Sequence, residues 1–323
     1  MGDPMNKTVV FRCDASPALG MGHVVRCRAL AKALAAEGWR VRFAMASGGE
    51  HVPDFQVTGP RWGACDALVV DVRDAVSPEQ LAAARAKGTL VVVLDDASDR
   101  RLAADLVFYP PVPQVGRLEW PGFEGESFSG WEWVILREEF GTPLPRVKND
   151  PPVVLISMGG SDPLGLTERV LAALDPAEIG CVVKVVTGPG YLEAHGGALP
   201  DFPDGSVHLA SPPNLPELMA SADLAVVSFG MTAYELAACG TPGIYLGISD
   251  DHAESASAFQ EAGLGINLGN FMSAGDVDIR EAVAALASNA PRRADMGVQG
   301  QRLVDGKGAE RIARVITDWT RGT

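Results

Sequence analysis

The chain has 323 residues, 47% hydrophobic and 21% charged, so it can bury a full core and suggests about two domains. Its net charge of −14 argues against partners with phosphate backbones or anionic lipid surfaces. The five cysteines have no Cys-x-x-Cys spacing, and no apolar run reaches the roughly 18 residues that a membrane helix needs. We therefore expect a cytoplasmic protein with reduced thiols and without nucleic-acid or membrane partners, either a monomer or a weak homodimer.

The first half of the chain alternates short apolar strands with amphipathic helices. Valine-rich runs joined by such helices are typical of parallel strands with right-handed crossovers. Acidic residues follow two of the strands, Asp71 in one case and Asp95-Asp96 in the other. Open α/β sheets bind ligands at this edge. The predicted strands are 8–13, 40–46, 67–72 and 89–94, and the predicted helices are 22–37 and 78–87.

A proline-rich segment, residues 144–152, separates this half from a second half with the same rhythm. The sequence thus predicts an α/β fold of two Rossmann-like domains that face each other across a cleft. The N-terminal domain is expected over residues 1–143 and the C-terminal domain over 153–323, with a last helix, 308–319, interpreted as packing back onto the N-terminal domain. The other elements predicted in the second half are strands 153–157, 181–187, 224–227, 244–246 and 265–268 and helices 163–174, 231–239 and 251–262.

Three glycine-bearing turns each close a predicted strand: residues 20–22, 159–161 and 228–232. A strand that ends in such a turn and continues as a helix presents N–H groups at the positive end of the helix dipole, which favours phosphate. The last two turns lie in one domain, so we expect them to share a diphosphate; alternatively, the glycines serve only the turn dihedrals. The expected binding residues in these two turns are Gly160, Ser161, Ser228, Gly230, Met231 and Thr232.

Charged residues near two predicted helix starts add to this nucleotide site. Glu235 lies three residues after Thr232, where its carboxylate can accept two ribose hydroxyls or only compensate the helix dipole. Asp251 and His252 open the next helix. They are expected to contact the phosphate or the leaving group, and the alternative is helix capping.

His23, directly after the first glycine turn, is the candidate for proton transfer. The ordinary pKa of histidine, near 6.5, suits a general base at neutral pH, and a helix N-terminus favours the neutral imidazole. Capping of its own turn is the alternative role. No histidine or carboxylate spacing fits a metal site, and no Gly-x-Ser-x-Gly elbow occurs. We therefore expect no metal, no cofactor and no serine nucleophile.

Several motifs together resemble the GT-B nucleotide-sugar superfamily, and more closely the hydrolases of pseudaminic acid synthesis, which release UDP from a UDP-linked diacetamido trideoxy sugar. The segment 228–242 also resembles the diphosphate-binding signature of the glycosyltransferase that makes the peptidoglycan lipid intermediate. The resemblance to the hydrolases spans nearly the whole chain. It is carried by Arg12-x-Asp14-x-Ser16-x-x-x-Gly20-x-Gly22-His23-x-x-Arg26, Leu94-Asp95-Asp96, Leu136-Arg137-Glu138-Glu139-Phe140, Met158-Gly159-Gly160-Ser161-Asp162-Pro163 and Asp305-Gly306-x-Gly308-Ala309-x-Arg311-Ile312.

The resemblance implies that His23 is the base and that Asp14 is catalytic with it. It implies substrate contacts by Gly20, Gly22, Arg26 and Asp96, and a diphosphate and ribose site over 230–235. Two departures from the family pattern fall on the expected ligand face. Asp71-Val72-Arg73-Asp74 lacks the aromatic residue usual in the hydrolases, and Asp251-His252 replaces the usual Asn-Gln.

The reaction that this resemblance implies is attack of water on the anomeric carbon of a UDP-sugar, with UDP as the leaving group. A GT-B glycosyltransferase with a UDP-sugar donor is the first alternative. A non-catalytic nucleotide-sugar-binding subunit is the second, and the two departures from the family pattern motivate it.

Overall fold

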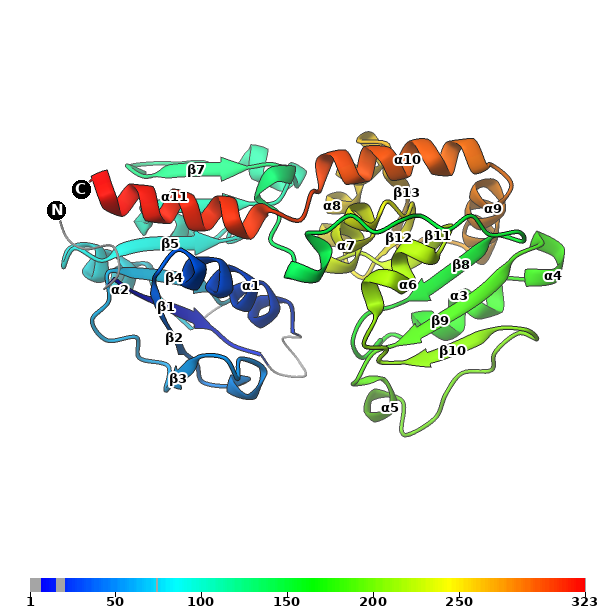
Figure 1. The fold of residues 1–323 in the computed structure, drawn as a ribbon, viewed down its shortest axis with the longest axis horizontal. Coiled ribbons are helices and arrows are strands. Elements are labelled where there is room, and N and C mark those ends of the chain that lie inside the picture. The colour runs from blue at the N-terminus through cyan, green and yellow to red at the C-terminus, as the bar shows by residue number, and fades with distance from the viewer. Residues whose placement is uncertain (1–6, 16–20, 74, 323) are drawn as a thin grey trace. The chain divides into compact units, whose positions relative to one another are not determined.

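The computed structural model, which describes residues 7–15, 21–73 and 75–322, divides into two compact units (Figure 1). Residues 1–138 and 306–323 form the N-terminal unit, and residues 139–305 form the C-terminal unit. The sequence-based division ended the N-terminal domain at residue 143 and counted 306–323 with the C-terminal domain, but it expected the last helix, 308–319, to pack on the N-terminal domain, to which these residues belong. Each unit is one parallel β-sheet covered by helices.

The N-terminal unit contains a seven-stranded sheet in the order β3-β2-β1-β4-β5-β6-β7, with every neighbouring pair parallel. Its strands are β1 (Thr8–Cys13), β2 (Arg40–Ala44), β3 (Gln56–Thr58), β4 (Ala67–Asp71), β5 (Leu90–Leu94), β6 (Leu106–Tyr109) and β7 (Glu126–Ser129). Its helices are α1 (Gly22–Ala36), α2 (Pro78–Arg85) and α11 (Gly308–Gly322), and its short 3-10 helices are η2 (Gly49–His51), η3 (Asp99–Ala103), η4 (Pro113–Arg117) and η5 (Trp131–Trp133). A further 3-10 helix, η6 (Glu138–Phe140), spans the point in the chain where the N-terminal unit ends and the C-terminal unit begins.

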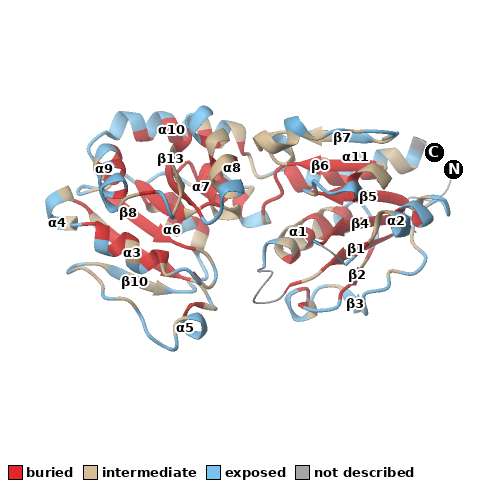
Figure 2. Ribbon diagram, turned by 180° about the vertical axis from the view of Figure 1, so that it is seen from behind, coloured by how far each residue is buried: buried red, intermediate tan, exposed pale blue. Residues whose placement is uncertain are grey.

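Alternating side chains of the central strands supply two apolar cores, one on each face of this sheet. On one face, Phe11 of β1 packs with Leu30 of α1 and Ile312 of α11. On the other face, Val70 of β4 packs with Leu81 of α2. Figure 2 shows the strands β1, β4 and β5 as continuous buried segments between these layers. Burial on both faces explains the near-continuous apolar runs of the sequence.

The C-terminal helix α11 belongs to the N-terminal unit because its apolar face completes the core beside α1. Ile316 is fully buried there, and Trp39 donates a hydrogen bond from Nε1 to Thr317 Oγ1 at 2.9 Å. Lys7 donates from Nζ to the carbonyl of Thr320. These contacts join residues about 280 to 310 positions apart in the chain.

The C-terminal unit contains a six-stranded sheet in the order β10-β9-β8-β11-β12-β13, again with every neighbouring pair parallel. Its strands are β8 (Val153–Ser157), β9 (Val182–Thr187), β10 (Val207–Ala210), β11 (Leu224–Ser228), β12 (Gly243–Gly247) and β13 (Gly265–Asn270). Its helices are α3 (Leu166–Ala173), α4 (Pro176–Ile179), α5 (Tyr191–Ala194), α6 (Leu215–Ser221), α7 (Met231–Cys239), α8 (Asp250–Glu261), α9 (Asp276–Ala287) and α10 (Ala290–Leu303).

Helix α3 begins later than the sequence predicts, at Leu166 rather than Pro163. Gly165, the residue before the helix, has the left-handed φ of 66°, which ends the helical path toward Pro163. The buried carboxylate of Asp162 accepts hydrogen bonds from the N–H groups of Leu166 at 2.9 Å and Thr167 at 2.8 Å. The loop between β8 and α3 is therefore a fixed turn and not the first turn of the helix.

Several elements have no counterpart among the predicted ones, namely β3, β6, β7, β10, α4, α5, α6, α9 and α10. Strand β7 lies at the edge of its sheet, and its polar sequence Glu-Ser-Phe-Ser has no buried residue. Such edge strands give no apolar run to detect. Their place in the sheet comes from backbone pairing with a neighbour.

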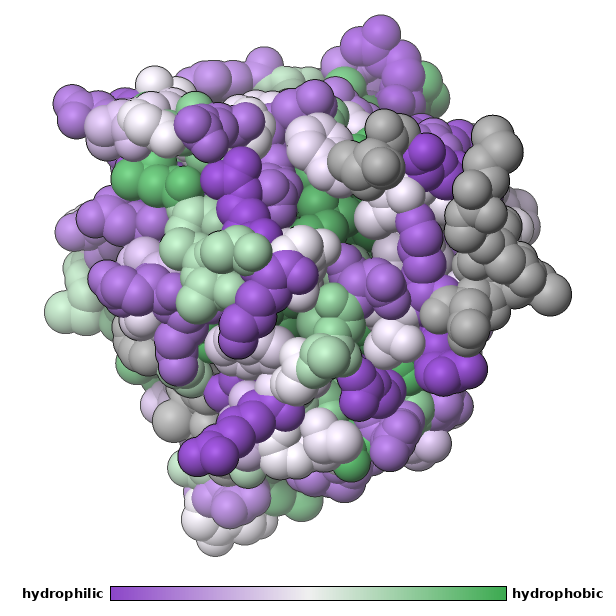
Figure 3. Space-filling view, turned by 90° about the vertical axis from the view of Figure 1, so that its left-hand side faces the viewer, coloured by the Kyte–Doolittle hydropathy of each residue, from purple (hydrophilic) through white to green (hydrophobic). Residues whose placement is uncertain are grey.

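No helix among the described residues is long and apolar enough to cross a membrane. Figure 3 shows one end of the N-terminal unit, where hydrophobic residues lie in small areas separated by hydrophilic ones. Small apolar areas of this kind are ordinary on a protein surface.

Candidate functional site

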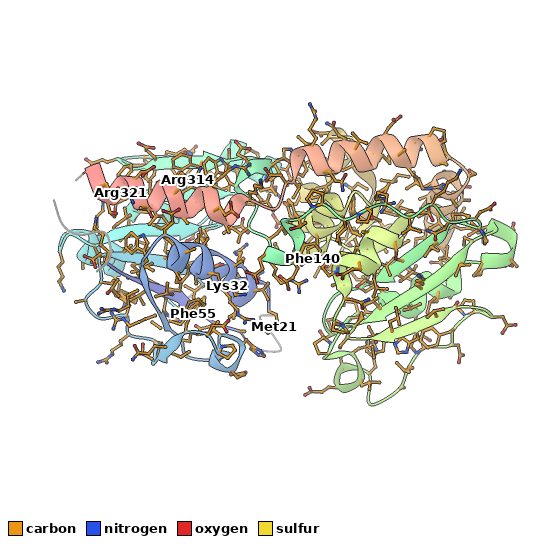
Figure 4. The ribbon with its side chains drawn as sticks, in the orientation of Figure 1. Met21, Lys32, Phe55, Phe140, Arg314 and Arg321 are labelled. Carbon is orange, nitrogen blue, oxygen red and sulfur yellow. The ribbon has the colours of Figure 1, made fainter. Side chains whose placement is uncertain are left out.

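His23 lies in the first turn of α1, close to the carboxyl end of the N-terminal sheet. Strands β1 and β4 pair so that Cys13 stands opposite Asp71, and α1 begins soon after β1 with Met21 as its N-cap residue. Met21 and Lys32, labelled in Figure 4, mark the beginning and the later part of this helix. The parallel crossover therefore brings His23 to the end of β4, 48 residues further along the chain.

The imidazole of His23 is bound to the carboxylate of Asp71. Nδ1 of His23 lies 2.6 Å from Oδ1 of Asp71, and the two side chains are 18% and 1% exposed. A carboxylate can only accept, so Nδ1 carries the hydrogen and the lone pair of the neutral ring is on Nε2. This tautomer is the one that a general base needs.

Arg26, one helical turn after His23, binds the same carboxylate and a second one. Its Nη2 donates to Oδ1 of Asp71 at 2.7 Å and its Nε to Oδ2, while Nη1 donates to Asp95 at 2.7 Å. Nη2 also lies 3.3 Å from Nδ1 of His23. A guanidinium can only donate, so this contact would need the lone pair of the histidine on Nδ1. The contact between Nδ1 and Asp71 is shorter, at 2.6 Å, and it decides that Nδ1 carries the hydrogen.

Arg26 and His23 keep the carboxylate of Asp71 ionised. Burial alone would raise the pKa of the Asp71 carboxyl, but the charge and hydrogen bonds of Arg26 and the bond to His23 outweigh it and lower the pKa to about 2. Asp71 is thus ionised at neutral pH. It can hold the ring of His23 in place and stabilise the imidazolium that forms when His23 takes a proton.

Of the two acidic residues that follow β5, it is Asp95 that joins this network. Asp95 has a left-handed φ of 50°, and its side chain is 37% exposed. Asp96, the residue chosen in the sequence analysis, is instead paired with Arg100 at 2.6 Å, with both side chains about nine-tenths buried. Both residues lie beyond Leu94, the last residue of β5, and only the packing shows which of them faces Arg26.

Asp14 makes contacts that organise the loop around β1. Its carboxylate pairs with Arg12 at 2.7 Å and accepts a hydrogen bond from the N–H group of Ala46 at 2.6 Å. Burial raises the pKa of Asp14, but these partners reverse the effect and the net shift is downward. The structure therefore places Asp14 against Arg12 and the loop after β2.

The two glycines of the first turn differ in what the structure describes. Gly20 lies outside the described residues. Gly22 is the first residue of α1 and is exposed, and a Cβ atom added there would meet no atom of the described residues within 4 Å.

In the C-terminal unit, the two turns expected to share a diphosphate are neighbours. Strands β8 and β11 pair so that Ser157 stands opposite Val227, and their loops emerge at the same edge. A Cβ atom added at Gly159, which has a φ of +89°, would lie 3.7 Å from Oγ of Ser228. The predicted residues Gly160, Ser161 and Ser228 are thus brought together at one sheet edge.

These turns present backbone donors. Within residues 7–15, 21–73 and 75–322, no hydrogen bond engages the N–H groups of Gly160, Ser161, Met231 or Thr232. Helix α7 starts after Gly230 without a side-chain cap and without an acidic residue in its first turn. Unpaired N–H groups at a helix N-terminus attract anions. The arrangement can bind phosphate oxygens.

The remaining predicted residues lie on α7 and α8. Glu235 is in the second turn of α7 and only 8% exposed. His252 is in the first turn of α8, which is capped by Ser249 Oγ accepting from the N–H group of His252 at 3.2 Å. The ring of His252 lies 6.5 Å from that of Phe229, so it adjoins the turn after β11. Asp251 precedes it and is exposed.

Side chains that could ligate a metal do not gather in one place among the residues that the structure describes. No cluster of three or more His, Cys, Asp or Glu side chains with suitable geometry occurs there. The cysteines Cys13, Cys27, Cys181 and Cys239 are buried free thiols and Cys65 is partly buried.

No protein-family model matches the chain. The spore coat polysaccharide biosynthesis protein SpsG of Bacillus subtilis (strain 168) is 26% identical over 202 residues, which are 59% of this chain. The chain thus spans 58% of the length of that relative.

Solved glycosyltransferase structures match over almost the whole chain. Acinetobacter baumannii MurG superposes with a TM-score of 0.71 at 17% identity, covering 98% of this chain and 100% of MurG. The spinosyn rhamnosyltransferase SpnG, complexed with thymidine diphosphate, superposes with a TM-score of 0.66 at 16% identity, covering 96% and 99%. Together with the two parallel sheets described above, these likenesses show that the chain has the GT-B fold of two Rossmann-like domains.

Proposed function

We propose that this protein hydrolyses a nucleotide-sugar of surface-polysaccharide synthesis, releasing UDP from a UDP-linked diacetamido trideoxy sugar. The observation that carries the proposal is the pair His23–Asp71, with 2.6 Å between Nδ1 and Oδ1. This pair leaves a lone pair on Nε2 in a side chain that is partly exposed. The relative SpsG, a polysaccharide biosynthesis protein by name, supports the cellular setting.

The C-terminal unit is proposed to hold the nucleotide diphosphate. The support is the set of N–H groups at Gly160, Ser161, Met231 and Thr232 that make no hydrogen bond within the described part of the chain. A structural neighbour with the same fold, SpnG, is complexed with thymidine diphosphate. Uridine as the nucleoside comes from the sequence resemblance.

The proposed reaction uses water as the nucleophile. Nε2 of His23 takes a proton from the water while its oxygen bonds to the anomeric carbon, and the C–O bond to UDP breaks with the electron pair leaving on the diphosphate. The backbone donors of the C-terminal unit stabilise that developing charge. The products are the free sugar and UDP, and His23 returns its proton to solvent. Asp71 and Arg26 keep the imidazole oriented.

Asp14 takes a positioning role in this proposal, and Asp95 takes a substrate-binding role. The contacts of Asp14 lie on Arg12 and on the loop after β2, so it holds that loop in place. The exposed carboxylate of Asp95, held by Arg26, is the acidic group that we assign to contact with the sugar in place of Asp96.

A GT-B glycosyltransferase is the second candidate, because the structural neighbour SpnG is titled a rhamnosyltransferase. The test is to incubate the protein with UDP-sugars and no acceptor and to measure released UDP. We expect UDP release in water alone. Release only after an acceptor is added would contradict hydrolysis and favour a transferase, and calorimetric binding without any turnover would favour a non-catalytic binding subunit.

Replacing Glu235 with alanine is expected to weaken UDP binding about tenfold, because two hydrogen bonds from ribose hydroxyls to the carboxylate would be lost. The dissociation constant is measured by calorimetry. Glu217→Ala serves as the control, since Glu217 is an exposed acidic residue in the first turn of the neighbouring helix α6. An unchanged affinity for UDP in Glu235→Ala would refute the ribose role.

A further inference from the structure

His195 lies outside the site that the sequence predicts, yet it contacts the glycine turn after β8. Its Nε2 donates a hydrogen bond to the backbone carbonyl of Asp162 at 2.8 Å. Its ring stacks on that of Tyr191, with 4.2 Å between centroids and 19° between planes. Tyr191 is only 3% exposed, so the histidine is held against a buried support.

The backbone of the same segment, residues 188–195, covers the turn closely. The N–H group of Gly190 donates to the carbonyl of Gly160 at 2.9 Å. A Cβ atom added at Gly188 would lie 2.4 Å from that carbonyl oxygen, and one at Gly190 would lie 3.2 Å from Cβ of Ser161. Only glycine permits this approach at position 188.

These contacts engage the carbonyl groups of the turn and leave its N–H groups available. The carbonyl oxygens of Gly160 and Asp162 both accept hydrogen bonds from segment 188–195, whereas the N–H groups of Gly160 and Ser161 donate none within the described ranges. Asp162 also has a left-handed φ of 45°. That conformation is strained for a residue other than glycine and persists only where surrounding contacts hold it.

We infer that His195 is a positioning residue for nucleotide binding: through the Asp162 carbonyl it holds the Gly159–Asp162 turn so that the N–H groups of Gly160 and Ser161 face a nucleoside diphosphate. The inference rests on the proposed function. The imidazole acts on the peptide that ends the turn and does not touch the ligand. The stacking on Tyr191 fixes the plane of the imidazole ring, and the hydrogen bond to the Asp162 carbonyl holds the backbone of the turn.

The test compares His195→Phe, which keeps an aromatic ring against Tyr191 but has no donor, with His195→Gln, whose side-chain amide can replace the Nε2 donor. His195→Phe is expected to raise the dissociation constant for UDP and the KM for the UDP-sugar about tenfold, as for one lost hydrogen bond. Its kcat is expected to fall as well, because the same N–H groups are proposed to stabilise the charge that develops on the diphosphate. His195→Gln is expected to restore most of the affinity.

The matched control is His208→Phe. His208 also stacks on an aromatic ring, Phe202 at 4.9 Å, and its Nε2 lies 2.8 Å from Oγ1 of Thr187, but it does not contact the turn. Its affinity for UDP is expected to stay within about twofold of wild type. Hydrogen exchange of the amides in residues 158–163 is expected to accelerate in His195→Phe and not in His208→Phe.

The possible failures are distinguishable. A wild-type protein that does not bind UDP would overturn the proposed function and this inference with it. A wild type that binds UDP, together with a His195→Phe variant whose affinity lies within twofold of it, would overturn the role of His195 alone. Equal losses of UDP affinity in His195→Phe and His195→Gln would also overturn it, because the side-chain hydrogen-bond donor at this position would then not explain the loss.

Discussion

His23→Ala is expected to lower the rate of UDP release by about 10²- to 10⁴-fold, the usual contribution of a general base. The imidazole bound to Asp71 is the group proposed to take the proton of the attacking water. Binding of UDP is expected to stay within about twofold of wild type, because the nucleotide is assigned to the turns of the C-terminal unit. Turnover of the UDP-sugar and calorimetric titration with UDP measure the two quantities separately.

His51→Ala is the matched control for this variant. His51 lies in the same unit, but its side chain is 43% exposed and pairs with Glu50, away from Asp71. Its turnover is expected to equal that of wild type. Normal turnover in His23→Ala would end the assignment of His23 as the base, whereas loss of UDP affinity in the same variant would indicate that His23 binds the nucleotide.

Asp71→Asn is expected to lower turnover by at least about 10²-fold. An asparagine can present its amide nitrogen to Nδ1 and stabilise the wrong tautomer, and it cannot balance the charge of an imidazolium. The same variant loses the partner of Arg26, a guanidinium whose side chain is only 13% exposed, so the free energy of unfolding at pH 7 is expected to fall as well.

The stability of the wild type is expected to depend on acid through this carboxylate. The pKa of Asp71 in the folded chain, about 2, lies below the ordinary value of 3.8, so its contribution is complete above pH 4 and is lost as the pH falls toward 2. The two values correspond to about 2 kcal/mol. Urea unfolding between pH 2 and pH 5 measures it, and Asp71→Asn is expected to show a shallower decline there.

Asp54→Asn provides the comparison for that experiment. Asp54 pairs with Arg28 on the surface, with side chains 46% and 37% exposed, and such pairs contribute little. Its acid dependence is expected to follow that of wild type. An Asp71→Asn variant with the same acid dependence as Asp54→Asn would contradict the coupling of Asp71 to Arg26 and His23.

Much of the fold could be predicted because buried parallel strands leave a clear pattern. The bounds of β1, β8 and α7 are those predicted, and the bounds of β4 and β5 differ by one residue. The strands among them are near-continuous apolar runs bounded by turn residues, which is the pattern of buried parallel strands. The predicted start of α3 was wrong because the left-handed residues Asp162 and Gly165 form a loop that cannot be detected from the spacing of apolar residues.

Individual residues of the candidate site could be predicted from the sequence, but the contacts between them could not. The turns at 159–161 and 228–232 and the histidine after Gly22 were visible as glycine-bearing turns between strands and helices. The partner of His23 was not assigned, although Asp71 was noted as a strand-terminal acid. Asp96 was chosen where the structure places Asp95 beside Arg26, since sequence spacing cannot tell which of two adjacent carboxylates faces α1.

The sequence by itself determined the α/β class, the parallel strands and the positions of the turns, because these depend on local patterns of apolar residues and glycine. Only the tertiary structure decided through which residues α11 completes the core of the N-terminal unit, that Asp71 binds Nδ1 of His23, and that His195 contacts the turn after β8. Each of these is a contact between residues 33 to about 280 positions apart. Strand pairing and packing bring such distant residues together, so the local sequence pattern does not predict their contacts.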